Sequence, residues 1–90
     1  MEWKFENPQD IKKFADHMSS ELMKRNKHEL ASEINQFCST PFTTSSEFLG
    51  EFRIIMKKVL SQKEIIFDKG TKNGILKSIE TINKAFGNRV

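Results

Sequence analysis

The stretch from Thr40 to Leu60, TPFTTSSEFLGEFRIIMKKVL, is the most informative part of the chain, because a polar loop runs directly into a strongly apolar helix pattern. Thr44 and Glu47 have the spacing of a capping box, which marks a helix start. On a helical wheel the apolar residues that follow occupy an arc of about 140°, wide enough for the central element of a core. They are Phe48, Leu49, Phe52, Ile55, Met56, Val59 and Leu60.

A second helix is predicted nearer the N-terminus. Asn7 is suited to the N-cap position, and Pro8 to the first helical position. Apolar residues then recur at i, i+3 and i+4 spacing from Ile11 to Leu22, which is typical of an amphipathic helix. We expect this helix to end near Asn26.

Two more helical patterns complete the chain. Asn26 and Glu29 again have capping-box spacing, and an apolar stripe runs from Leu30 to Cys38. The short link before this stripe predicts that the first two helices pack antiparallel. The last pattern covers residues 74–87. The apolar residues predicted to share its inner face are Ile75, Leu76, Ile79, Ile82 and Phe86.

The sequence therefore predicts an all-α fold, a single-domain bundle of four main helices over residues 1–90. A chain of this length allows one domain with one modest core. The segment from Ser61 to Gly70, SQKEIIFDKG, is ambiguous, since EIIF is also prone to β structure and the KNG after it could turn a hairpin. We expect a short extra helix or a turn at about 62–68, because a helical pattern follows.

Composition bounds the class of protein. The chain is 37% hydrophobic and 30% charged, which is ordinary for a soluble globular domain. Its single cysteine excludes an intramolecular disulfide and favours a reducing compartment. The N-terminus lacks the apolar run of a signal peptide, and no segment approaches the roughly 20 apolar residues of a membrane span. We expect a cytoplasmic protein that does not associate with membranes.

Residue types that carry catalytic or metal chemistry are present but poorly grouped. Cys38 ends an apolar stripe, which indicates a core thiol rather than a nucleophile. His17 and Glu21 could share a helix face, but no third ligand follows in a recognisable spacing. Gly70 and Gly74 match neither a phosphate-binding loop nor a dinucleotide fingerprint. We therefore expect neither an enzyme nor a cofactor or metal site.

Charge is distributed unevenly along the chain. Residues 1–45 carry six basic and seven acidic side chains, a net charge of −1, whereas residues 46–90 carry nine and five, a net charge of +4. A basic half favours an acidic partner, including nucleic acid. Glu47 and Glu51 would repel phosphate, however, at the leading end of the third predicted helix. The candidate nucleic-acid contacts are Lys57, Lys58, Lys63, Lys69 and Lys72.

Protein binding has an argument of its own. Gly50 and Ile54 lie outside the apolar arc of their helix and form a small apolar notch among charges of both signs, as in an interface with a polar rim. Alternatively, another helix covers Gly50 and the notch belongs to the core. Phe42 is either an anchor at a loop tip or, as we expect, folded back over Phe37 and Phe48. The candidate partner-binding residues are Phe42, Glu47, Glu51, Ile54, Lys57 and Lys58.

Residues 45–60, SSEFLGEFRIIMKKVL, resemble a segment of small all-helical bacterial immunity proteins, which are encoded beside secreted or contact-dependent toxins. The resemblance covers 16 of the 90 residues. It implies a cytoplasmic protein that binds a cognate toxin domain and neutralises it. Immunity proteins against nucleases are often acidic, whereas this chain has a net charge of +3. That departure points away from a nuclease partner unless the acidic part of the chain does the binding.

These observations favour a small helical protein-binding module, an immunity protein that neutralises a toxin by occlusion. The alternative is a DNA- or RNA-binding regulator that uses the basic C-terminal half. A third possibility is a homodimer in which the notch of one copy closes on the other. The sequence leaves open whether the chain is a monomer or a homodimer.

Overall fold

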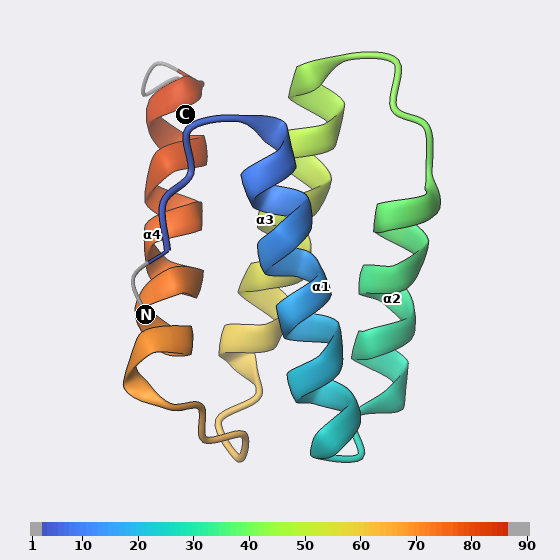
Figure 1. Cartoon of the computed structure of the whole chain (residues 1–90), viewed down its shortest axis with the longest axis vertical. Coiled ribbons are helices and arrows are strands. Elements are labelled where there is room, and N and C mark those ends of the chain that lie inside the picture. Colours follow the sequence, from blue (N-terminus) through green and yellow to red (C-terminus); the bar gives the residue numbers. More distant parts are fainter. Residues whose placement is uncertain (1–2, 87–90) are drawn as a thin grey trace.

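The computed structural model describes residues 3–86 and contains four helices in that range (Figure 1). They are α1 (Pro8–Lys24), α2 (His28–Ser39), α3 (Ser45–Ser61) and α4 (Lys69–Ala85). Successive helices run in opposite directions and pack side by side, and α1 also contacts α4, so that the four form a closed ring. The all-α four-helix prediction is confirmed. Among residues 3–86, no helix combines the length and apolar character needed to cross a membrane.

Two of the three predicted helix caps are present. The Asn7 side chain accepts a hydrogen bond from the Asp10 backbone N–H (3.1 Å), and the Thr44 hydroxyl accepts one from the Glu47 N–H (3.1 Å). The Asn26 cap is wrong, because the N-cap of α2 is Lys27 and no side chain caps it. Asn26 instead has φ 61°. Asparagine tolerates this left-handed conformation, which reverses the chain between α1 and α2.

The core fills the centre of the ring, and α3 contributes to it as predicted. Five residues of its apolar arc are buried, while Leu49 and Leu60 pack against them from the edge. Phe14 and Phe52 are fully buried, with ring centroids 6.5 Å apart across the bundle. The buried arc residues are Phe48, Phe52, Ile55, Met56 and Val59.

The start and inner face of α4 differ from the prediction. The helix begins at Lys69, before the predicted residue 74, while the predicted end at 87 lies outside the described range. Leu76 is 48% exposed, so its placement on the inner face is wrong. At Gly74 the aromatic rings of Trp3 and Phe14 lie so close that a side chain would collide with them. The buried residues of α4 are Thr71, Gly74, Ile75, Ser78 and Ile82.

The segment between α3 and α4 is a turn followed by irregular backbone, in agreement with the second of the two predicted forms. Arg25, at the end of α1, holds it in place. The Arg25 guanidinium donates to the Ile66 carbonyl from Nε (3.3 Å) and Nη2 (3.2 Å), and it lies 5.0 Å from the ring centroid of Phe67. Arg25 also donates to the Glu21 carboxylate at 2.8 Å. One side chain therefore ties α1 to the loop.

Candidate functional site

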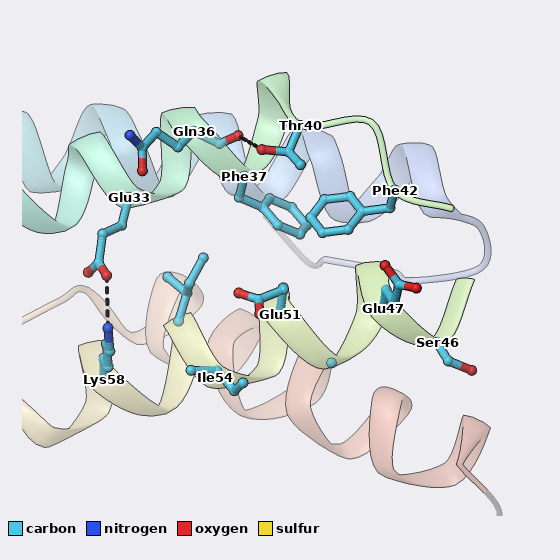
Figure 2. A pocket seen from close by; sticks show the side chains of 12 residues that line it. Glu33, Gln36, Phe37, Thr40, Phe42, Ser46, Glu47, Glu51, Ile54 and Lys58 are labelled. Carbon is cyan, nitrogen blue, oxygen red and sulfur yellow. Dashed lines mark hydrogen bonds and ion pairs between the residues drawn. The ribbon is translucent and has the colours of Figure 1, made fainter. Parts of the chain in front are cut away.

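A groove of about 570 Å³ runs along the bundle between α2 and α3 (Figure 2). Both walls are helical, and the aromatic rings of Phe37 and Phe42 line one end of it. The α2 side of the groove consists of Glu33, Gln36, Phe37 and Thr40, and Phe42 follows in the loop. The α3 side consists of Ser46, Glu47, Gly50, Glu51, Ile54, Ile55 and Lys58.

The floor of the groove is apolar and reaches backbone level. A Cβ atom built on Gly50 has no heavy atom within 4 Å in the space it would enter, so no other element of residues 3–86 covers this glycine. Ile54, one turn further along α3, is 51% exposed. The interpretation in which a packed helix covers Gly50 is therefore wrong, because the notch opens to the surface of the described structure.

Phe42 folds back as predicted. Its ring centroid lies 5.4 Å from that of Phe37 and 5.7 Å from that of Phe48. The ring is partly buried and still lines the groove. This packing fixes the loop between α2 and α3, so Phe42 forms a preorganised wall rather than a free anchor at a loop tip.

Charged groups of both signs surround the apolar floor. Lys58 Nζ lies 2.8 Å from Glu33 Oε1, which links α3 to α2 across the end of the groove opposite Phe42. The hydrogen bond to Glu33, reinforced by its charge, raises the pKa of Lys58 above its usual value. Within residues 3–86 neither Glu47 nor Glu51 forms an ion pair. The four charged groups give the groove a net charge of −2.

The structure brings together five of the six residues predicted to bind a partner. Phe42, Glu47, Glu51, Ile54 and Lys58 all line the groove, and the exposed Lys57 does not. Lys57 lies about 100° around the helix from its neighbour Lys58, and its side chain is not among those that line the groove.

Sequence reasoning missed the wall that α2 contributes. Glu33, Gln36, Phe37 and Thr40 have i, i+3, i+4 and i+7 spacing, which is a helix-face signal in its own right. The pattern was visible in the sequence. Which face of α2 lies beside α3 depends on the packing of the whole bundle.

The lysines proposed for nucleic-acid binding are divided between different places. Lys58 belongs to the groove and pairs with Glu33. Lys63 and Lys72 line a separate hollow of about 310 Å³ beside the loop between α3 and α4, where Ile66 is 82% exposed. The groove and this hollow share no lining residue.

The other residues considered for chemistry have structural partners. Burial, followed by the negative charge of Asp16, raises the pKa of the Cys38 thiol, which keeps it protonated at neutral pH. His17 Nε2 lies 3.0 Å from the Thr71 hydroxyl on α4. Glu21 instead pairs with Arg25, so His17 and Glu21 belong to different contacts.

In comparisons with protein families, with characterised proteins and with solved structures, no match to this chain was found.

Proposed function

We propose that this chain is a protein-binding module that acts by covering a functional surface of its partner, a cognate toxin domain. The groove between α2 and α3 carries this proposal, because it is an uncovered depression with an apolar floor and a charged rim. The resemblance of residues 45–60 to immunity proteins supplies the class of partner, and residues 46–58 of that segment form one groove wall.

Binding would follow the usual division of roles within an interface. Apolar contacts at Gly50, Ile54 and Phe42 would supply most of the affinity, because they lose water on association. The charged rim would set the register and the association rate. In this proposal the chain has no catalytic role and inhibits by occlusion alone.

The groove also bears on the kind of toxin. Although the whole chain has a net charge of +3, the groove has a net charge of −2. The local charge of the groove, rather than that of the whole chain, would meet the partner. A cationic toxin surface therefore suits the proposal, and nucleases commonly present such a surface to their anionic substrates.

The direct test is protection of cells. Reading frames that flank the gene for this chain are expressed singly in a bacterial host, with and without the chain. We expect one of them to arrest growth and the intact chain to restore it. The Ile54→Glu variant should lose protection, while the matched Leu76→Glu variant should keep it, since Leu76 is similarly exposed (48% against 51%) but lies outside the groove.

The nucleic-acid alternative makes the opposite prediction. If the purified chain binds duplex DNA with an affinity that falls steeply with salt, and Ile54→Glu has no effect on any activity, the proposal is wrong. Loss of that DNA binding in a Lys63→Glu/Lys72→Glu variant would assign function to the hollow beside the loop. Equal protection by Ile54→Glu and the unaltered chain would also overturn the groove as the binding surface.

A further inference from the structure

The shape of the groove limits what can occupy it. Its α3 wall extends from Ser46 to Lys58, which corresponds to a length of about 18 Å along a helix. A partner helix of about twelve residues, or roughly three turns, has the same length. The groove is therefore long enough for a short secondary-structure element and too long for a single side chain.

The backbone chemistry of the walls favours a helix as the occupant. Both walls are α-helices whose backbone groups are hydrogen-bonded internally, so neither offers a free sheet edge. An extended segment would have to bury N–H and C=O groups without partners there. A helix satisfies its own backbone and presents only side chains, as in other helix-in-groove complexes.

The rows of side chains on the two walls also suit a helix. On α3 the groove residues Ser46, Gly50, Ile54 and Lys58 follow one i, i+4 row. Between such rows the ridge of a partner helix can pack. Gly50 interrupts the row with an uncovered space in which a built Cβ meets no atom within 4 Å. A large apolar side chain of the partner can reach backbone level at this point.

The distribution of charge along the groove indicates where the bound segment would carry its positive charges. Glu47 lies near the Phe42 end and Glu51 lies one helical turn further along α3, towards the middle of the groove; within residues 3–86 neither forms an ion pair. At the other end, Lys58 is already neutralised by Glu33 at 2.8 Å. The carboxylates that form no ion pair among the described residues therefore lie in the half of the groove nearer Phe42, and a partner would place its cations there.

We infer that the groove binds an amphipathic α-helix of the partner protein, with an apolar row at i, i+3 or i+4 and i+7 and with Lys or Arg on the flank facing Glu47 and Glu51. This inference rests on the proposed function and deepens it by naming the partner's binding element. A large apolar residue in the middle of that helix enters the space at Gly50.

A peptide selection tests the inference without knowledge of the partner. A displayed library of randomised peptides of about sixteen residues is selected on the folded chain. We expect the enriched peptides to combine the apolar row with Lys or Arg on one flank and to become helical on binding, measured by circular dichroism. Their affinity should fall at least about tenfold against Ile54→Glu and stay within about twofold against Leu76→Glu.

Exchanging the charges of the groove and of the peptide gives a more specific test of the inference. The Glu47→Lys/Glu51→Lys variant should bind the cationic peptides about tenfold more weakly, and peptides with Glu in place of Lys should recover the loss. The Glu80→Lys variant is the control, because it reverses a charge on α4 outside the groove. Added salt should weaken binding of the original pair.

Different negative results would contradict the helix inference and the proposed function. Selected peptides that are acidic or extended, yet still depend on Ile54, overturn the inference and leave groove binding in place. An empty selection also overturns it, while the growth assay tests occlusion independently. If Ile54→Glu affects neither peptides nor growth rescue, both proposals fail. A concentration-dependent dimer of the chain that Ile54→Glu abolishes would make a second copy the occupant and refute a partner helix.

Discussion

Gly74 and Gly50 are both helical glycines, yet they mark opposite kinds of surface. A Cβ at Gly74 would lie 2.6 Å from Cε1 of Phe14 and 2.9 Å from Cδ1 of Trp3. A Cβ at Gly50 would meet no atom within 4 Å. Gly74 therefore allows close packing on the α1–α4 side, whereas Gly50 leaves a space between α2 and α3. Glycine thus permits close contact on the α1–α4 side of the bundle and leaves an open groove on the α2–α3 side.

Polar groups on the two sides show the same contrast. On the α1–α4 side, Ser78 is buried and its hydroxyl donates to the Ile75 carbonyl at 2.8 Å, while Thr71 is within hydrogen-bond distance of His17. These groups are satisfied inside the chain. Glu47 and Glu51 on the α2–α3 side remain exposed, and within residues 3–86 they pair with no cation. Groups left available in this way are suited to an external partner.

The largest effect on the free energy of unfolding is expected from a substitution at Gly74, the glycine that packs against aromatic rings. Gly74→Ala should destabilise the fold by about 2 kcal/mol, because the added methyl forces Phe14 and Trp3 to move and this outweighs the better helix propensity of alanine. Urea unfolding followed by circular dichroism measures the change. Trp3 is the single tryptophan, so its emission should shift as well. Unchanged stability and emission would show that Trp3 does not cover Gly74.

The matched substitution at Gly50 should have the opposite sign. Gly50→Ala should stabilise the chain by about 0.5–1 kcal/mol, because alanine is the better helix former and nothing occupies the space. The same unfolding experiment measures it. Within the proposed function, the added methyl should also weaken partner binding. Destabilisation by Gly50→Ala would contradict an open groove.

A smaller effect should depend on pH. The hydrogen bond from Arg25 lowers the pKa of Glu21 below its ordinary value of 4.5, so the ionised carboxylate stabilises the fold above that pH. We expect Glu21→Gln to cost about 0.5 kcal/mol near neutral pH. The difference from the unaltered chain should disappear as the pH falls through the lowered pKa. A cost that is equal at pH 3 and pH 7 would show that the ion pair contributes nothing.

The smallest effect on stability is expected from the substitutions that probe the groove. Ile54→Glu and Leu76→Glu should each change the free energy of unfolding by less than about 0.5 kcal/mol, because both side chains are about half exposed. Thermal unfolding of the two variants side by side is the measurement. A large loss for Ile54→Glu alone would show that this residue belongs to the core, and the protection assay could not then be interpreted.

The features predicted correctly from the sequence depend mainly on local interactions. The Thr44 cap and the buried arc of α3 follow from spacing within one helix, since capping and amphipathicity need no knowledge of other helices. Leu76 was misplaced because the face of α4 that is buried depends on the packing of distant parts of the chain, such as Trp3 and Phe14 against Gly74. Likewise, Ile54 could be recognised as lying off the core arc, but the α2 wall of the groove is a property of packing.

The order of neighbours around the ring has a kinetic consequence. Three of the four helix contacts join elements that follow one another in the chain, and only the α1–α4 contact joins the two ends. Local contacts form quickly, because short loops cost little entropy to close. We expect the α2–α3 pair to assemble early and the α1–α4 seam late. In stopped-flow refolding, Trp3 fluorescence should therefore lag behind the recovery of helical signal.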